Sequence, residues 1–390
     1  MMQTEYIIIG TYAIVWCMAM LRCYGYLRMK RAVGKAKAKP EPSDLPPLSV
    51  IIPTYEQCDA LQRNLPTILK QEYPQTFEVI VVDMRSTDET LTYLESLAIR
   101  FPHLHVTRIP ETARSVSLIR LALTLGIRAA SHEWIVLTQP NCRPVSPDWL
   151  LRMGQTCSEK KETKMVLGYT QFRREAVSWN ALRCRFFRLW QQMLHLPYAL
   201  RHGAYRADGT NLCYRRSLFL QHRGFADHSN LLVGATDIMV NRNSTKENTA
   251  VCLHPDAFME QETPRYARWW RQERLFFMET RRHFSQGLLY RLKYAGLVGL
   301  TWLFTLSTVG ALLLSLLWLK DSLTAIVVAV LWVLHAICRA YTFTVSTKEL
   351  GAHPIILTLP VLLHLIPLWD SIAWLHWLFT KKKTFQKKFI

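Results

Sequence analysis

Two short stretches of the chain carry polar side chains whose types and spacing suit the binding of a charged ligand. Residues 53–56 read Pro-Thr-Tyr-Glu, and residues 83–88 read Asp-Met-Arg-Ser-Thr-Asp. Their carboxylate, hydroxyl and guanidinium groups supply hydrogen-bond donors and acceptors for a polar ligand. The candidate binding residues in these stretches are Pro53, Thr54, Tyr55, Glu56, Asp83 and Arg85.

Each stretch directly follows a short apolar run, Leu48–Ile52 or Val79–Val82, and a helix-like run, Leu61–Leu69, lies between them. Short β-branched runs separated by a helical crossover predict a parallel βαβ unit. Ligands bind open α/β sheets at the carboxyl ends of the strands, which is where both stretches would lie. Further helices are expected at Leu91–Phe101 and Ala113–Ser131, and further strands at His105–Arg108 and Trp134–Thr138.

The sequence of both stretches resembles the nucleotide-sugar-binding half of membrane-bound, bacterial-type family 2 glycosyltransferases. In that family the first strand ends in Pro-x-Tyr-Asn-Glu and the second in Val-Asp-Asp-x-Ser-x-Asp. The resemblance covers about residues 48–284. It implies an α/β fold: a nucleotide-sugar-binding, Rossmann-like (GT-A type) mixed sheet with helices on both faces, plus transmembrane helices. It also implies a UDP- or GDP-sugar donor, with Asp83 on the nucleotide and Thr54 and Glu56 beside it.

The end of the expected strand Trp134–Thr138 departs from the family. Gln139 and Asn141 stand where the family has Asp-x-Asp, although Asp148-Trp149-Leu150 follows in frame. Paired carboxylates hold Mg²⁺ or Mn²⁺ against a diphosphate, whereas neutral amides bind such ions weakly. No cofactor is therefore certain, and Mg or Mn is disfavoured. Cations that could replace the metal are Arg85, Arg114 and Arg143.

A later stretch, residues 208–216, resembles the family's acceptor-side sequence, and Gly224-Phe225 matches its next landmark. The resemblance places Gly209 and Asn211 beside the substrate. Glycine also lets backbone approach a ligand closely, although ordinary turn glycines would look the same.

The acidic pair expected to contain the general base is displaced. When Gly234 and Asn241 are aligned with the family without gaps, Ala235 and Thr236 fall on that pair. Asp237 then lies one residue C-terminal to the pair. Asp237 is nevertheless the candidate base that would deprotonate an acceptor hydroxyl for inverting attack. The alternative is an Asp that merely stabilises a helix N-terminus.

Residues 264–293 combine aromatic side chains with arginines and predict an amphipathic interfacial helix. Gln272 matches the family's Gln-x-x-Arg-Trp, but its Arg-Trp falls on Leu275-Phe276. Such a helix would turn the site toward the bilayer, favouring a lipid-linked or glycan acceptor and contact with anionic membrane lipid.

Apolar segments divide the rest of the chain. Residues 1–28 predict a transmembrane helix, 29–47 a basic, Pro-rich linker, 48–263 the catalytic-type domain, and 294–345 two more spans. Cations after the first span place the domain in the cytoplasm of an inner-membrane, multi-pass protein. Residues 354–380 form a third C-terminal apolar segment. A basic tail, 381–390, favours a re-entrant or interfacial segment over a fourth span.

Composition supports this assignment. The 390-residue chain has a formal net charge of +19, which suits basic cytoplasmic flanks, and it contains no nucleic-acid-binding motif. Its nine cysteines show no Cys-x-x-Cys spacing, as expected of reduced thiols.

Two functions stay open. The first is a metal-light, hexosyltransferase-type enzyme, for example in cell-envelope polysaccharide synthesis. The second is a catalytically degenerate pseudoenzyme that acts as a binding or scaffold partner.

Overall fold

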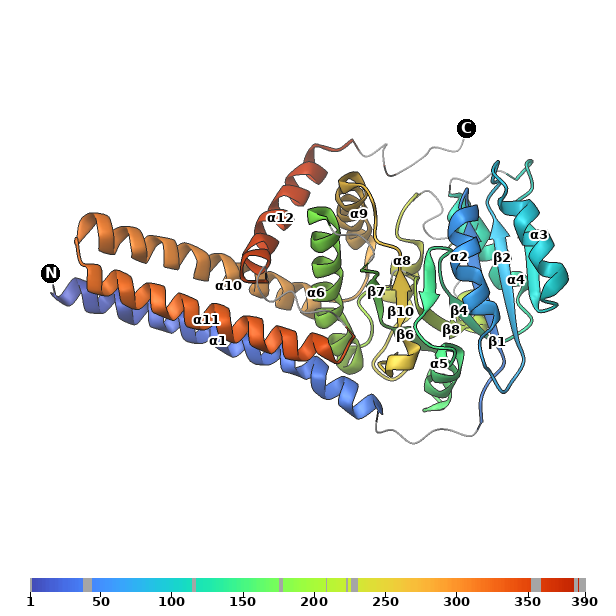
Figure 1. Cartoon of the computed structure of the whole chain (residues 1–390), viewed down its shortest axis with the longest axis horizontal. Helices are drawn as coiled ribbons and strands as arrows, with labels where there is room; N and C mark the ends of the chain where they lie inside the picture. Colours follow the sequence, from blue (N-terminus) through green and yellow to red (C-terminus); the bar gives the residue numbers. More distant parts are fainter. Residues whose placement is uncertain are drawn as a thin grey trace. The chain divides into compact units, whose positions relative to one another are not determined.

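The computed structural model describes residues 2–37, 44–113, 117–174, 178–207, 209–221, 224–225, 231–351, 359–381 and 385. The chain divides into two units (Figure 1). The helical unit comprises residues 1–34 and 288–375, and the globular unit comprises residues 35–287 and 376–390. Each unit is described by itself.

The described elements follow in chain order. They are α1 (Met2–Lys37), β1 (Leu48–Thr54), α2 (Cys58–Leu69), β2 (Phe77–Asp83), α3 (Thr90–Arg100), β3 (Leu104–Arg108), α4 (Leu118–Ala129), β4 (Trp134–Leu137), β5 (Cys142–Pro144), α5 (Trp149–Ser158), β6 (Met165–Gly168), β7 (Thr170–Phe172), α6 (Trp179–His202), β8 (Leu212–Arg215), α7 (Arg216–Gln221), α8 (Ala235–Asn243), β9 (Thr249–Cys252), η2 (Pro255–Ala257), β10 (Met259–Gln261), α9 (Ala267–Thr280), η3 (Arg281–His283), α10 (Leu288–Leu313), η4 (Leu314–Trp318), α11 (Ser322–Lys348) and α12 (Leu359–Phe379).

A seven-stranded mixed sheet forms the centre of the globular unit, with strand order β3-β2-β1-β4-β8-β6-β9. Strands β3, β2, β1 and β4 are parallel, and β8 runs antiparallel to both β4 and β6. Thr54 at the end of β1 pairs in register with Asp83 at the end of β2. The predicted βαβ unit and its shared carboxyl edge are therefore present.

Both faces of β1, β2 and β4 are buried, which explains the continuous apolar sequences of these strands. Val50 and Ile52 of β1 belong to one core cluster with Leu61 of α2 and Leu94 of α3. Ile51 points to the other face, where it approaches Gly126 of α4. The sheet therefore carries helices on both faces, as predicted.

A second, three-stranded sheet, β5-β10-β7, was not anticipated from the sequence. In it β10 pairs antiparallel with β5 and parallel with β7. Its strands are only three residues each, too short to give a periodic pattern. This sheet brings Gln261 of β10 close to the polar residues that follow β4.

Side-chain contacts fix the relative directions of the helices in the helical unit. Trp16 Nε1 of α1 donates to the Leu331 carbonyl of α11 at 2.7 Å, and the Tyr26 and Phe343 rings meet at 5.3 Å, so α1 and α11 run parallel. The hydroxyls of Tyr12 and Thr308 lie 3.1 Å apart, whereas Arg22 contacts Leu297. Helix α10 therefore runs antiparallel to α1.

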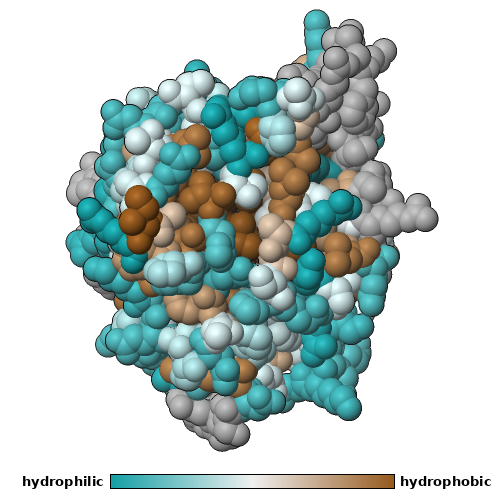
Figure 2. Space-filling view, turned by 90° about the vertical axis from the view of Figure 1, so that its right-hand side faces the viewer, coloured by the Kyte–Doolittle hydropathy of each residue, from teal (hydrophilic) through white to brown (hydrophobic). Residues whose placement is uncertain are grey.

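Four helices are long and apolar enough to cross a membrane: Glu5–Lys37, Leu288–Trp318, Ser322–Lys348 and Val361–Phe379. The helical unit exposes large apolar side chains along these helices, for example Leu317 at 73% and Leu323 at 71%. The face drawn in Figure 2, the α3 side of the globular unit, instead mixes hydrophobic residues with many hydrophilic ones. The first surface suits lipid contact, and the second suits water.

Some predicted boundaries differ from the observed ones. The expected helix at 113–131 is observed as Leu118–Ala129, with residues 114–116 outside the described part. The expected amphipathic helix over 264–293 consists of α9 and η3, and a separate helix, α10, begins at Leu288. Gly287 lies between them with φ +99°, where a Cβ would collide with the Tyr205 ring. Glycine adopts this positive φ with little strain, unlike residues that carry a Cβ.

Candidate functional site

Asp83 lies at the carboxyl edge of β2, as expected, but its side chain is fully enclosed. Its carboxylate accepts the Ser86 N–H at 3.1 and 3.2 Å and lies 3.4 Å from Arg108 Nε. In this conformation Asp83 holds the loop after β2 in place. Contact with a nucleotide would require Arg108 or the loop to move.

The loops after β1 and β2 are tied together at Glu56. Glu56 has a left-handed backbone, φ +48°, which aims its N–H at Ser86 Oγ, 2.8 Å away. Its carboxylate accepts the Thr87 hydroxyl at 2.9 Å. Pro53 and Thr54 are buried, whereas Tyr55 is 48% exposed. Among residues 53–56, Tyr55 and Glu56 are thus accessible to a ligand.

The arginines expected to replace a metal are engaged in other contacts. Arg85 has φ +68° and donates to the carbonyls of Pro110 and Ala113 at 2.5 and 2.6 Å. Arg143 on β5 forms a cross-strand pair with Glu260 on β10 at 3.0 Å. Arg114 lies outside the described residues.

A chain of amides occupies the place of the family's Asp-x-Asp. Gln261 Nε2 donates to Gln139 Oε1 at 3.0 Å and lies 3.4 Å from Asn141 Oδ1. The side-chain oxygen of Gln261, Oε1, in turn accepts from Arg188 Nη2 at 2.8 Å. One guanidinium is therefore coupled, through Gln261, to both residues that replace the carboxylates.

The donor set at this place does not suit a divalent ion. Gln139 and Asn141 offer neutral oxygens that already accept hydrogen bonds from Gln261, and Arg188 adds a positive charge beside them. Mg²⁺ and Mn²⁺ prefer anionic oxygen ligands. Within the described part of the chain, no three His, Cys, Asp or Glu side chains are grouped as metal ligands. Among the described side chains, Arg188 brings positive charge to this site.

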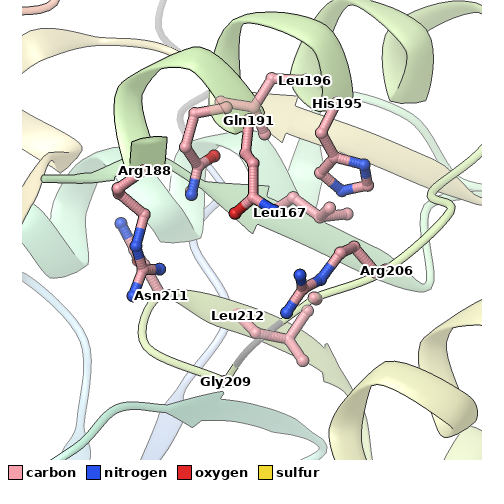
Figure 3. Close-up of a pocket in the computed structure, with 12 residues that line it drawn as sticks. Leu167, Arg188, Gln191, His195, Leu196, Arg206, Gly209, Asn211 and Leu212 are labelled. Atoms are coloured by element: carbon pink, nitrogen blue, oxygen red, sulfur yellow. The ribbon is translucent and has the colours of Figure 1, made fainter. Parts of the chain in front are cut away.

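A small cavity lies beside this network, between α6 and the strands β6 and β8 (Figure 3). Its volume is about 40 Å³, space on the scale of a phosphate rather than a whole nucleotide sugar. Arg188 and Arg206 approach it from opposite sides, and Gln191 and His195 of α6 line its roof. Gly209 and Asn211 also line the cavity.

Arg206 connects this cavity to the candidate base. Its Nε and Nη2 donate to the two oxygens of Asp237 at 3.1 and 3.2 Å, and its guanidinium stacks on Phe277 at 4.2 Å. Asp237 lies in the first turn of α8, 7% exposed. To receive a proton from an acceptor, Asp237 must turn one oxygen away from Arg206.

Two glycines allow this close packing. Gly234 caps α8 with φ +68°, and a Cβ there would lie 2.2 Å from the Thr280 methyl group. Gly209 has φ +74° and packs against Thr236. Both positions require glycine because the left-handed region strains other residues.

Asn211 and Gln272 are located very differently. Asn211 is buried, accepts from Trp149 Nε1 at 3.1 Å and donates to the carbonyls of Tyr169 and Ala257. These bonds give it a structural role in addition to its place at the cavity. Gln272 is exposed on α9. On the same helix, buried Arg274 stacks on Phe187 and Trp270.

Glu262, next to the network, is held as a carboxylate. Burial would raise its pKa, but hydrogen bonds from Arg63 and Asn64, together with the charges of Arg63 and Arg173, lower the pKa below its ordinary value. The Glu262 N–H donates to the Asn141 carbonyl at 2.9 Å. The negative charge of Glu262 is therefore balanced by arginines and does not offset Arg188.

Sequence reasoning missed Arg188, Arg206 and Gln261. One signal was available for the first: Arg188, Gln191, Gln192 and His195 recur at helical spacing within an aromatic-rich helix. No local signal marks Arg206 or Gln261, because their partners are distant in sequence.

Most of the globular unit is similar in sequence to known proteins. Residues 46–279 match the sequence model of a family described as "Glycosyltransferase like family 2". Glycosyltransferase AglE of Haloferax volcanii is 31% identical over 117 residues, 30% of this chain and 37% of that protein. Uncharacterized glycosyltransferase YfnE of Bacillus subtilis is 48% identical over 63 residues, 16% of each chain. The alignments thus span less than half the length of both curated relatives.

Among solved structures, mannosyltransferase PcManGT from Pyrobaculum calidifontis, in complex with GDP-Man and Mn²⁺, is similar with a TM-score of 0.59. The two chains are 18% identical, and the match covers 97% of this chain and 100% of the other. At this identity the likeness concerns the fold. It confirms the expected GT-A-type mixed sheet with helices around it.

Proposed function

Since the chain belongs to glycosyltransferase family 2, we propose that it is a membrane-bound transferase that moves a sugar from a nucleotide-sugar donor to a lipid-linked or glycan acceptor by inverting attack. A UDP- or GDP-sugar is the donor class, in keeping with the GDP-Man bound to the mannosyltransferase of similar fold. Glu56, Tyr55 and, after rearrangement, Asp83 are the groups available to hold the nucleoside.

One observation carries the proposal for how the donor is held. Arg188 is hydrogen-bonded to Gln261, and Gln261 donates to Gln139 and Asn141. These two amides stand where the family has metal-binding carboxylates. The diphosphate of a nucleotide sugar is anionic, and guanidinium groups bind phosphate oxygens through charge-assisted hydrogen bonds. We therefore assign diphosphate binding to Arg188, with Arg206 on the opposite side of the cavity, and expect no requirement for a divalent ion.

Replacing Arg188 by glutamine is expected to weaken the binding of UDP and GDP by about 10- to 100-fold, because a charge-assisted hydrogen bond contributes about 1.5–3 kcal/mol. Isothermal titration calorimetry on the full chain in detergent, with EDTA present throughout, measures this loss directly.

Arg201→Gln is the matched control, since Arg201 is an exposed arginine near the end of the same helix. Its affinity for UDP and GDP should stay within about twofold of the unsubstituted protein, as surface substitutions away from a site have small effects. Equal affinities in Arg188→Gln and Arg201→Gln would contradict the assignment. Binding that disappears in EDTA before any substitution would contradict the metal-free site itself.

The scaffold function stays as the second candidate because of the Asp237–Arg206 pair. Both oxygens of Asp237 accept from Arg206, so the candidate base is engaged in a structural ion pair. A protein that binds nucleotide diphosphates but never turns a donor over would have this function. Donor turnover distinguishes the two.

For the membrane arrangement we propose three spans, with α12 as a re-entrant segment that returns to the cytoplasmic side. In support, Thr305 and His364 are hydrogen-bonded at 2.9 Å, and the Tyr294 hydroxyl donates to Asp370 at 2.5 Å. Helix α12 thus runs antiparallel to α10, and His364 near its start lies beside Thr305 of α10. Residues 352–358, which lead into α12, lie outside the described part of the chain.

A reporter fused after Ile390 should therefore be cytoplasmic, on the same side as a reporter inserted in the linker at residues 38–43. Paired reporters that fluoresce or become enzymatically active only in one compartment measure this. Opposite sides for the two reporters would require a fourth span and exclude a re-entrant α12.

A further inference from the structure

Two arginines, one half-buried and one buried, lie between neighbouring helices of the helical unit. Arg22 on α1 donates to the Leu297 carbonyl of α10 at 3.0 Å and to the Thr301 hydroxyl. Arg339 on α11 is 4% exposed. One helical turn after these two arginines, the rings of Tyr26 and Phe343 meet at 5.3 Å. Both arginines therefore lie at the same level of the parallel helices α1 and α11. Ionisable groups inside a membrane-spanning bundle are costly and mark functional sites.

Donor atoms in this region have no acceptor among the described residues. Arg22 Nε, the Tyr26 hydroxyl, and Arg339 Nε and Nη2 are all buried and make no hydrogen bond. Nearly all buried polar groups in folded proteins are paired, so several orphans at one place indicate a missing partner. Since three of the four atoms belong to cations, the missing partner is an anion with several acceptor oxygens.

The helical unit does not supply that anion itself. Its described acidic residues are Glu5, Asp321, Glu349 and Asp370. Asp321 caps the opposite end of α11, and Asp370 accepts from Tyr294. Neither Arg22 nor Arg339 forms an ion pair with any of these four side chains in the described part of the chain. A buried pair of like charges without a counter-ion is strongly unfavourable.

The site lies toward the basic ends of the helices. After Arg22, helix α1 continues through Arg28, Lys30 and Arg31 to Lys35 and Lys37. Arg339 lies in the C-terminal half of α11, which ends at Lys348. By the positive-inside rule these ends meet the cytoplasmic head-group layer. Arg22 is only half-buried, so a lipid head group can reach the site from the side of the bundle.

We infer that Arg22 and Arg339, with the Tyr26 hydroxyl, form a binding site for the phosphate group of an anionic membrane lipid. A phosphate offers several acceptor oxygens and at least one negative charge, which matches the orphan donors in number and sign. The inference rests on the membrane insertion proposed above but not on sugar transfer. Binding at this site can therefore be tested whether or not the protein turns over a donor.

The test measures lipid binding to the purified full chain in a non-ionic detergent. Native mass spectrometry and thermal melting are recorded with phosphatidylglycerol, farnesyl monophosphate, phosphatidylcholine and inorganic phosphate as probes. We expect phosphatidylglycerol or farnesyl monophosphate to raise the melting temperature and to stay bound. Whichever of the two binds more tightly identifies the lipid class. Inorganic phosphate acting as strongly as either lipid would overturn the inference of a lipid site.

Arg339→Met should weaken binding of the preferred lipid by at least about tenfold, the loss expected for a charge-assisted hydrogen bond. Without lipid, its melting temperature should equal or exceed that of the unsubstituted protein, because an apolar side chain removes an uncompensated buried charge. This opposite pair of effects distinguishes a ligand site from a structural arginine. A merely structural Arg339 would lower the melting temperature and leave the response to lipid intact.

Arg31→Met is the matched control, because Arg31 is an exposed arginine on α1 whose guanidinium contacts Tyr24. It removes the same charge and should leave lipid binding within about twofold, as expected for an exposed position. If Arg31→Met weakens binding as much as Arg339→Met, the attraction is general electrostatics and the site is excluded. Should Arg339→Met fail to fold, Arg339→Lys decides, since it keeps the charge but loses the fork of donors and should still weaken binding.

Discussion

Replacing Asp237 by asparagine is expected to lower the rate of donor turnover by about 10²- to 10⁴-fold, the usual contribution of a general base. Asparagine keeps the size of the side chain but cannot take up the proton of the attacking hydroxyl. The measurement is the release of UDP from UDP-glucose and of GDP from GDP-mannose, with water as the acceptor and EDTA present.

This substitution also breaks the pair with Arg206, so affinity must be measured beside rate. A role in catalysis lowers kcat and leaves the dissociation constant of UDP nearly unchanged. A role in holding Arg206 in place weakens UDP binding in proportion to the rate. Full turnover in Asp237→Asn would remove the base assignment. Tight UDP binding without turnover in the unsubstituted protein would favour the scaffold function.

Restoring carboxylates with the double substitution Gln139→Asp and Asn141→Asp is expected to weaken metal-free UDP binding by at least about 100-fold. Two negative charges would then face the diphosphate, and like charges brought together cost several kcal/mol. Mn²⁺ should restore binding in this variant, because paired carboxylates are suitable ligands for it. Calorimetry with EDTA, and then with excess Mn²⁺, measures both effects.

The neutral exchange Gln139→Asn with Asn141→Gln serves as the control. It changes the lengths of the same two side chains but not their charge, so its UDP affinity should not respond to Mn²⁺. Strong Mn²⁺ dependence in either the control or the unsubstituted protein would show that these amides tolerate a metal, and the arginine-based site would be wrong.

If the arginine-based site is correct, the neutral residues Gln139 and Asn141 in place of Asp-x-Asp and the presence of Arg188 on α6 depend on each other. In a metal site the ion supplies the positive charge that faces the diphosphate, and the carboxylates hold the ion in position. An arginine supplies that positive charge from its own guanidinium. Neutral side chains at 139 and 141 then serve Arg188, since they accept from the Gln261 amide and turn its carbonyl oxygen toward the guanidinium. Carboxylates at the same places would attract Arg188 away from a ligand.

Sequence alone determined the fold class, because that information is local. Leu48–Ile52 and Val79–Val82 are apolar throughout and bounded by polar residues, as buried parallel strands must be. Strand polarity then fixed which edge carries Thr54 and Asp83, and their register in the structure agrees. Long apolar helices were equally readable, since their length and hydropathy do not depend on partners.

Only the tertiary structure decided which cations face the cavity. Arg85 and Arg143 were reasonable candidates by position, yet backbone carbonyls and Glu260 hold them elsewhere. Arg188 reaches the site through Gln261, on a strand that pairs with β5 and β7 far away in sequence. Arg22 and Arg339 likewise come to the same level of the helical unit because α1 and α11 pack in parallel. The type of a side chain and its local periodicity can be read from the sequence. The partner of a charged side chain depends on long-range packing.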